Sequence, residues 1–315
     1  MSPRNATALR LRLRRPQLSA PLPQIPLPPG RAVVVPGRGE FFVRDSGGDG
    51  PPVLLVHGWM FPSDLNWLHT YQPLRAAGYR VLAMDLRGHG RGLRSGEPFR
   101  LTDCAEDAAG LLSVVGVGPV LVVGYSMGGP VAQLLAKRHP DRVAGIVLCA
   151  TALDWSDLRQ KVVWRTMGGL RLLLGLFPRG VWSAGMRLSG ASSPESNWVA
   201  SELSRGSARD LAEAGRELGR FDSSPWTAEL GQPRAVVLMT RDRLVPPRKQ
   251  QALADALGVD PVRIDADHDA CSVEPNRFVT ALLSALADVR RGEQAGVQGG
   301  AHGRSAELRS AARPA

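Results

Sequence analysis

The chain has 315 residues, of which 43% are hydrophobic and 22% are charged. This length and composition predict one large α/β domain or two small ones, and they exclude a disulfide miniprotein, a collagen-like chain and a wholly disordered chain. The three cysteines form no Cys-x-x-Cys pair, so we expect neither a disulfide framework nor a cysteine zinc site, and a reducing, cytoplasmic location is predicted. No apolar run reaches the roughly 18 residues of a membrane span, so no stable membrane insertion is expected.

The formal charge of +10 is concentrated at the two ends of the chain. Residues 1–39 hold seven arginines and no acidic residue, and residues 289–315 hold five arginines and two glutamates. The body, residues 40–288, holds 27 basic and 27 acidic residues, so a basic groove across the fold and a nucleic-acid partner are not expected. We predict a flexible Arg/Pro-rich arm over residues 1–30 and a disordered tail over residues 291–315.

Short runs rich in β-branched residues alternate with helical stretches along the body. The predicted strands are Arg31–Val35, Glu40–Arg44, Pro52–Val56, Arg80–Met84, Pro119–Val123, Ala144–Cys149, Ala235–Thr240 and Val262–Asp265. The predicted helices are Thr102–Val115, Met127–Arg138, Arg248–Leu257 and Pro275–Val289. This order predicts an α/β fold with a mostly parallel, eight-stranded sheet flanked by helices, and an antiparallel hairpin of the first two strands at one edge.

Residues 151–225 interrupt this alternation, because they contain tryptophans and apolar stretches but no convincing strand. We predict a helical cap or lid there, inserted between two parts of the core, residues 31–150 and 226–290. Leu173 and Phe177 in this insertion are candidates to line an acyl pocket. Arginines flank an apolar face within residues 162–182, which leaves a membrane-surface role open, although a lid helix packed on the core is the simpler interpretation.

The strongest signal for chemistry is the segment Gly124-Tyr125-Ser126-Met127-Gly128, which follows an apolar strand directly and opens a helix. The glycines leave room for a sharp turn that holds the serine in a strained conformation and raises Oγ at the end of the strand. The helix N-terminus beside it favours developing negative charge. Ser126 is therefore the predicted nucleophile, against the alternative of a plain glycine-rich turn, and Tyr125 is a candidate pocket residue.

A serine nucleophile needs a base, and the base needs an acid that fixes its tautomer. His268 follows the last predicted strand, where a loop would bring it over the end of the sheet, and it is the predicted base. Asp242 comes directly after the strand Ala235–Thr240 and is the predicted acid, with Asp154 in reserve. A solvated loop histidine and an aspartate that only caps the next helix are the alternatives.

The oxyanion of an acyl-transfer intermediate needs two hydrogen-bond donors. The backbone N–H groups of Trp59, after a buried strand, and of Met127, after the predicted nucleophile, are the candidates. Trp59 is also a candidate pocket residue, whereas His57 is interpreted as a structural residue of the turn. Cys271 lies close to His268 in the chain, but no glycine-rich elbow surrounds it, so a thiol nucleophile is not expected.

These motifs resemble those of the α/β-hydrolase fold family, in its lidded serine esterase and haloperoxidase-like branch. The resemblance spans about residues 31–290 and rests on His57-Gly58-Trp59, Asp85-Leu86-Arg87-Gly88-His89-Gly90, the elbow around Ser126, the segment Arg241–Pro246 and the His268 loop. It implies an acyl-enzyme mechanism without metal or organic cofactor and a lid between the sixth and seventh strands. Epoxide hydrolases and haloalkane dehalogenases of this fold carry aspartate at the elbow, so Ser126 argues against an alkyl-ester intermediate.

The predicted function is hydrolysis of a carboxylic ester or thioester of a small or lipid-like apolar substrate. Three other reactions on the same triad stay open, namely a cofactor-free perhydrolase or haloperoxidase-type reaction, acyl transfer and carbon–carbon bond hydrolysis. A ligand-binding protein with a vestigial triad is a further alternative. The sequence does not indicate an oligomeric state.

Overall fold

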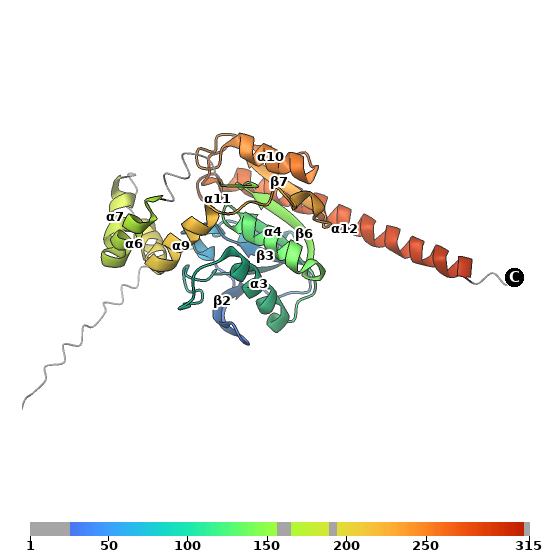
Figure 1. The fold of residues 1–315 in the computed structure, drawn as a ribbon, viewed down its shortest axis with the longest axis horizontal. Helices are drawn as coiled ribbons and strands as arrows, with labels where there is room; N and C mark the ends of the chain where they lie inside the picture. The colour runs from blue at the N-terminus through green and yellow to red at the C-terminus, as the bar shows by residue number, and fades with distance from the viewer. Residues whose placement is uncertain (1–25, 156–164, 189–193, 312–315) are drawn as a thin grey trace, which may run out of the picture.

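The computed structural model describes residues 26–155, 165–188 and 194–311 (Figure 1). Its centre is an eight-stranded sheet in the spatial order β1-β2-β4-β3-β5-β6-β7-β8. The strands are β1 (Gly30–Val35), β2 (Gly39–Asp45), β3 (Pro52–Val56), β4 (Arg80–Met84), β5 (Val120–Tyr125), β6 (Val143–Cys149), β7 (Arg234–Met239) and β8 (Val262–Ile264). Strands β3 to β8 run parallel, while β1 and β2 form an antiparallel hairpin at one edge. The predicted α/β-hydrolase fold is confirmed.

Helices cover both faces of the sheet, which explains why the central strands are continuous apolar runs. In β3, Leu54 and Val56 pack into one core layer, while Val53 and Leu55 pack into the other. The first layer is closed by α3 (Leu101–Val115), α4 (Gly128–Arg138) and α10 (Pro247–Leu257). The second is closed by α2 (Tyr71–Ala76), α11 (Ala270–Val273) and the start of α12 (Pro275–Ala311).

The two ends of the chain differ in part from the sequence prediction. Helix α12 continues through residues 291–311 and projects away from the sheet, where the sequence predicts a disordered tail (Figure 1). This stretch contains no proline, and extending an anchored helix by one residue costs far less than nucleating a new one. At the other end, the carbonyls of Pro28 and Pro29 accept hydrogen bonds from Arg44 and Asp45, so residues 26–30 are attached to β2. Residues 1–25 of the predicted arm and 312–315 of the predicted tail lie outside the described residues.

Between β6 and β7 the described chain forms helices α6 (Met167–Leu176), α7 (Pro178–Leu188), α8 (Pro194–Leu203) and α9 (Ala208–Leu218), which we call the cap helices. An isolated bridge between Asp154 and Asp222 joins the two ends of this insertion. Several contacts attach it to the core, among them an apolar cluster and a backbone hydrogen bond. Trp198 and Leu203 of α8 pack on Leu65 of α1 (Ser63–Asn66), and the Ser207 N–H donates to the Gly88 carbonyl at 2.7 Å. Helices α6 and α7 lie on the outer side of α9, away from the sheet (Figure 1).

No helix in the described part of the chain is both long and apolar enough to cross a bilayer.

Candidate active site

Ser126 occupies a sharp turn between β5 and α4 and has a backbone φ of 51°. An L-residue adopts this left-handed conformation only where its surroundings enforce it. Here the Ser126 N–H donates to the Cys149 carbonyl at 2.9 Å. A Cβ atom on Gly128 would lie 2.1 Å from the Val56 carbonyl oxygen, and one on Gly124 would lie 2.4 Å from the Gly128 oxygen. The turn therefore needs both glycines, as the sequence motif predicts.

The three predicted triad residues lie in one hydrogen-bonded chain at the carboxyl ends of the parallel strands. His268 Nε2 lies 3.0 Å from Ser126 Oγ, and His268 Nδ1 lies 2.8 Å from Asp242 Oδ2. Ser126, Asp242 and His268 follow β5, β7 and β8, so the parallel sheet brings their ends to the same edge. The reserve candidate Asp154 instead binds Lys249 Nζ at 3.0 Å. The distances fit a nucleophile, a base and an orienting acid.

Further contacts hold the acid and the base in place, and the sequence analysis missed them. Asp242 Oδ2 also accepts from Gln250 Nε2 at 2.9 Å, while Oδ1 accepts the N–H groups of Leu244 and Val245. The Tyr125 hydroxyl donates to the His268 carbonyl at 2.6 Å. Gln250 lies eight residues after Asp242, in α10, and carries no motif, so no local signal could have identified it.

The turn after β3 lies directly against the nucleophile, since a Cβ on Gly58 would lie 3.3 Å from Ser126 Cβ. Two hydrogen bonds orient this turn. The Gly58 N–H donates to Asn66 Oδ1 at 2.9 Å, and the Trp59 indole N–H donates to the Leu211 carbonyl of α9 at 2.7 Å. Met127 follows Ser126 as the N-cap of α4, where the first N–H groups of a helix have no intrahelical acceptor. The two predicted oxyanion donors thus belong to segments on either side of Ser126.

His57 is a structural residue of the turn after β3 and not a catalytic base, as the sequence indicates. Its Nε2 accepts the Leu86 N–H at 2.9 Å, and its Nδ1 lies 2.8 Å from the Gly58 carbonyl. The ring is fully buried, and burial lowers its pKa below the usual value. His89 lies beside it with ring centroids 5.1 Å apart. Burial and the neighbouring His57 lower the pKa of His89 to about 3, so both rings are neutral at pH 7.

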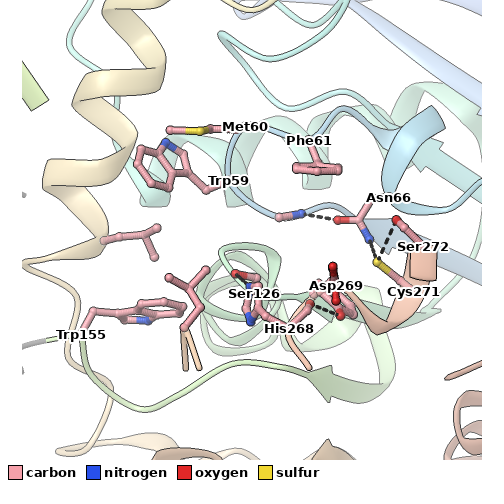
Figure 2. Close-up of a pocket in the computed structure, with 14 residues that line it drawn as sticks. Trp59, Met60, Phe61, Asn66, Ser126, Trp155, His268, Asp269, Cys271 and Ser272 are labelled. Carbon is pink, nitrogen blue, oxygen red and sulfur yellow. Dashed lines mark hydrogen bonds between the residues drawn. The ribbon is translucent and has the colours of Figure 1, made fainter. Parts of the chain in front are cut away.

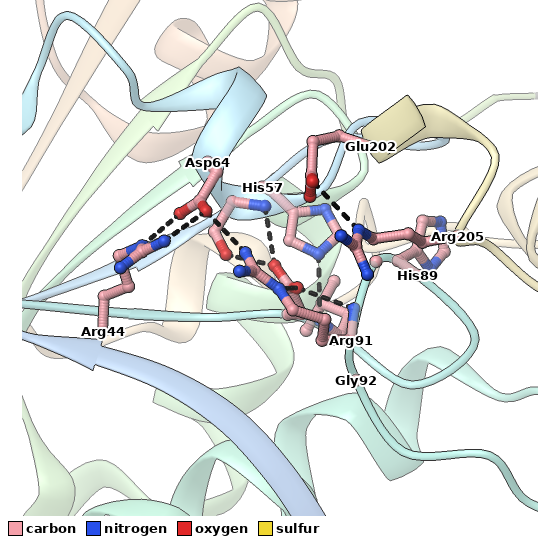
Figure 3. A network of polar contacts seen from close by, with 12 residues as sticks. Arg44, His57, Asp64, His89, Arg91, Gly92, Glu202 and Arg205 are labelled. Carbon is pink, nitrogen blue, oxygen red and sulfur yellow. Dashed lines mark hydrogen bonds and ion pairs between the residues drawn. The ribbon is translucent and has the colours of Figure 1, made fainter. Parts of the chain in front are cut away.

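A buried polar cluster around Asp64 and Asp85 lies next to His57 and the turn after β3 (Figure 3). Asp64 accepts from Arg44 and Arg91, each at 2.6 Å, and its neighbour Asp85 accepts the N–H groups of Ser63 and Arg91. Burial raises the pKa of Asp85, but the nearby His57 and Arg91 and the Ser63 hydrogen bond outweigh it, so the pKa lies below its usual value. Because each carboxylate is paired, the cluster fixes the loops before and after it without offering a free acid.

A cavity of about 250 Å³ opens beside Ser126 (Figure 2). Trp59 and Phe61 lie on one side of it, and Ser126, His268 and Trp155 lie on the other. Its lining is mainly apolar: Gly58, Trp59, Met60, Phe61, Asn66, Tyr125, Ser126, Trp155, Leu218, Leu244, His268, Asp269, Cys271 and Ser272. The predicted pocket residues Trp59 and Tyr125 belong to this lining.

The other two predicted pocket residues do not line the cavity. Leu173 is 55% exposed and Phe177 is 63% exposed on the outside of the cap. The reason is that α6 turns Met167 and Leu174 inward and packs against α9, which leaves Leu173 and Phe177 on the outer side. The cap contributes Leu218 of α9 to the cavity instead.

Cys271 lines the cavity, but its environment does not make it a nucleophile. Burial raises the pKa of this thiol to about 11, so it stays protonated at pH 7. Its Sγ lies 3.7 Å from Asn66 Nδ2. All three cysteines are buried and free. Within the described ranges, no three His, Cys, Asp or Glu side chains are grouped to hold a metal ion.

The fold and this site define a hydrolase of the α/β type, and the comparison with known proteins agrees. Residues 53–281 match the alpha/beta hydrolase family, and the chain belongs to that family. Epoxide hydrolase B of Mycobacterium tuberculosis is 43% identical over 110 residues, which are 33% of this chain and 30% of that protein. A non-heme haloperoxidase of Rhodococcus erythropolis is 40% identical over 110 residues, which are 35% of this chain and 39% of that protein.

Both alignments cover well under two thirds of the relatives' own lengths, at 30% and 39%. A solved structure matches over a longer range. That of a thermophilic esterase from Thermogutta terrifontis has a TM-score of 0.69 and 25% sequence identity, and the match covers 83% of this chain and 99% of that one. The relatives thus share the fold but differ in their reactions.

Proposed function

We propose that this protein hydrolyses a carboxylic ester or thioester of a small or lipid-like apolar substrate through an acyl-enzyme on Ser126. The observation that carries the proposal is the chain of two hydrogen bonds, 3.0 and 2.8 Å long, from Ser126 through His268 to Asp242 beside an apolar cavity. A serine in this arrangement attacks acyl carbons, because its base removes the hydroxyl proton as the new bond forms.

In the first half of the proposed reaction, Ser126 Oγ bonds to the carbonyl carbon while His268 Nε2 takes the Oγ proton. The backbone N–H groups of Trp59 and Met127 stabilise the resulting oxyanion. When the intermediate collapses, the bond to the leaving oxygen or sulfur breaks, and His268 gives that atom the proton. Asp242 fixes the ring and stabilises the imidazolium throughout.

In the second half, water replaces the alcohol or thiol. His268 takes a proton from water as the water oxygen attacks the acyl carbon, and it returns the proton to Ser126 Oγ when the acid leaves. No cofactor takes part in this proposal. The serine also separates the proposed chemistry from that of the similar epoxide hydrolase, since ring opening would leave an alkyl ether on Ser126, which water does not hydrolyse.

The cavity favours small acyl groups. Its volume of about 250 Å³ lies just below the usual range of ligand pockets, about 300–1,000 Å³. Trp59, Trp155 and Leu218 bound it with apolar surface. We expect p-nitrophenyl acetate and butyrate to be hydrolysed with higher kcat/KM than the octanoate, and a preference for the octanoate would contradict the volume argument.

The test of the proposal is labelling with a fluorophosphonate probe together with hydrolysis of p-nitrophenyl acetate. The wild-type protein should be labelled stoichiometrically, and Ser126→Ala should lose the label and at least about 10⁴-fold in kcat. Ser113→Ala, on α3, is the matched control and should behave as wild type. Equal labelling of Ser126→Ala and wild type would refute the assignment, and a folded wild type without label or turnover would favour a binding protein with a vestigial triad.

The perhydrolase alternative is favoured by a separate observation, the 40% local identity to a non-heme haloperoxidase. Peroxide in place of water would convert the same acyl-enzyme into a peracid, and an alcohol in place of water would give acyl transfer. Carbon–carbon bond hydrolysis would keep water as the acceptor but would use a donor whose leaving group is bound through carbon. Turnover of one acyl donor with water, hydrogen peroxide and alcohol as competing acceptors separates hydrolysis, perhydrolysis and acyl transfer. Partition mainly into peracid would replace the hydrolase proposal with a perhydrolase.

We also propose a cytoplasmic location and no nucleic-acid partner. The three free, buried cysteines support the first proposal, and the equal numbers of basic and acidic residues in residues 40–288 support the second.

A further inference from the structure

The outside of the cap carries a cluster of exposed apolar side chains. We call Leu172, Leu173, Leu176 and Phe177 the α6 face; these residues are 62%, 55%, 62% and 63% exposed. They are four of the nine large hydrophobic residues that are exposed in the described part of the chain, and they lie within six consecutive positions. A contiguous apolar patch on a surface marks an interaction site more often than single scattered residues do.

The α6 face is not required for the packing of the cap. Met167 and Leu174, only 2% and 4% exposed, form the inner side of the same helix, which packs against α9. Helix α6 is therefore apolar on two sides, while a helix that only covers a core needs one apolar stripe. The outer side is exposed, and Figure 1 shows α6 and α7 at the end of the cap that lies away from the sheet.

The charged side chains of the segment that carries this face, residues 165–185, are all arginines. Arg165, Arg171 and Arg179 are exposed, and residues 165–185 contain no acidic residue. Glu213 of α9 is within electrostatic reach of Arg171, but it already pairs with Arg209 at 3.0 Å. An apolar face bordered by arginines complements an interface that offers both hydrocarbon and negative charge.

We propose that the α6 face binds the surface of an anionic lipid bilayer, with the leucines and Phe177 in the headgroup–acyl boundary and the arginines at the lipid phosphates. Interfacial helices combine these two features, and their binding grows with buried apolar area and with anionic lipid content. A second copy of the chain is a poorer occupant, because two such faces would bring their arginines together.

The position of the face relates it to the cavity. Helix α6 packs on α9, the Leu211 carbonyl of α9 accepts the Trp59 indole N–H, and Leu218 of α9 lines the cavity. Bilayer contact would therefore place the cavity one helix layer from a source of apolar substrate. The binding itself is independent of the proposed hydrolysis, so each can fail without the other.

The test is co-sedimentation of the full chain with vesicles of phosphatidylcholine alone and of equimolar phosphatidylcholine and phosphatidylglycerol. Wild type should bind the anionic vesicles more tightly, and added salt should weaken the binding. Leu173→Ser/Phe177→Ser should lower the partition coefficient about tenfold or more per side chain. Arg171→Gln/Arg179→Gln should lower it about fivefold per arginine on anionic vesicles alone.

Val34→Ser is the matched control, since Val34 is 64% exposed on β1 at the far edge of the sheet. It should bind as wild type, and circular dichroism should show that every variant is folded. Equal binding of wild type and Leu173→Ser/Phe177→Ser would overturn the proposal and would point to the arginine-rich N-terminal residues. Self-association that the double variant abolishes, without vesicle binding, would assign the face to a second copy and would equally overturn it.

Discussion

Asp242 illustrates how a single side chain depends on its neighbours. Its two carboxylate oxygens accept four hydrogen bonds, from His268, Gln250 and the N–H groups of Leu244 and Val245. The two backbone N–H groups donate to Oδ1, whereas Gln250 and His268 both contact Oδ2. Gln250 in turn accepts the Met239 N–H at 3.0 Å, so it links the end of β7 to the acid. Gln250 is thus a positioning residue for the base.

We expect Gln250→Leu to lower kcat on p-nitrophenyl acetate about tenfold with KM nearly unchanged. The loss of one charge-assisted hydrogen bond loosens Oδ2, the oxygen that His268 contacts, which weakens the orientation of His268 but leaves the cavity intact. The pH profile of kcat should also shift, because Asp242 would stabilise the imidazolium less well.

Gln251→Leu is the control for this prediction. Gln251 is the next residue of α10, and it binds Asp255 and Arg263 at the surface. If Gln250→Leu changed thermal stability but neither kcat nor its pH profile, Gln250 would have a packing role only.

The residue scale is where sequence patterns were most informative and also where they failed. Ser126, Asp242 and His268 each follow a strand and carry the residue type that acyl chemistry needs, so local patterns identified them. Asn66 and Gln250 contact the site through side chains in helices. A single polar residue in a helix is usually a surface residue, and no feature of the local sequence distinguishes Asn66 and Gln250 from such residues.

At the scale of elements, the strand–turn–helix unit around Ser126 needs its glycines for close backbone contact. Gly128 lies against the Val56 carbonyl, where an added Cβ would approach to 2.1 Å. The atom in contact belongs to the backbone, which cannot change position by a side-chain rotation. An added Cβ would therefore require β3 or α4 to move.

We therefore predict that Gly128→Ala lowers the free energy of unfolding by about 1–3 kcal/mol and reduces kcat by about 100-fold. The activity falls because the displaced turn carries Ser126 away from His268. Chemical denaturation and p-nitrophenyl acetate kinetics measure the two effects.

Gly118→Ala serves as the comparison, because a Cβ at that position has no atom within 4 Å. It should be neutral in both assays. A Gly128→Ala protein with wild-type turnover would show that the elbow tolerates the shift.

Hydrophobic periodicity predicts the cap helices but not which side of each helix is buried. The apolar residues of α6 predict a helix with an inner side, but they do not say which side faces inward, because leucines occupy half of its positions. Contact with α9 selects Met167 and Leu174, and Leu173 and Phe177 are left outside.

At the scale of the whole molecule, buried histidines make stability depend on pH. His89 is fully buried beside His57, and its pKa is lowered to about 3, while an unfolded histidine has the ordinary value of 6.5. Between these two pH values the unfolded chain binds a proton that the folded chain does not. The stability contributed by neutral His89 is therefore complete above about pH 6.5 and is lost as the pH falls towards 3.

We predict that His89 accounts for about 3 kcal/mol of the loss in unfolding free energy between pH 7 and pH 4. In His89→Asn, whose amide can still donate to the Arg87 carbonyl that His89 Nδ1 contacts at 2.9 Å, this pH dependence should be shallower by that amount. Urea denaturation at several pH values measures the slope. Equal slopes for His89→Asn and wild type would show that His89 is not the titrating group.

The sequence by itself determined the eight strands, the hairpin at the edge, the inserted helices and the order of the triad. These features follow from local causes: a buried strand must be apolar along its length, and a strand-to-helix turn with a raised serine needs small residues around it. Parallel strand order then brings Ser126, Asp242 and His268 to one edge.

Only the tertiary structure decided the lining of the cavity and the outward direction of the α6 face. Each of these depends on contacts between segments far apart in the chain, as between Asn66 and Cys271, 205 residues apart. Such contacts result from how whole layers pack, and residue type and local period do not encode them.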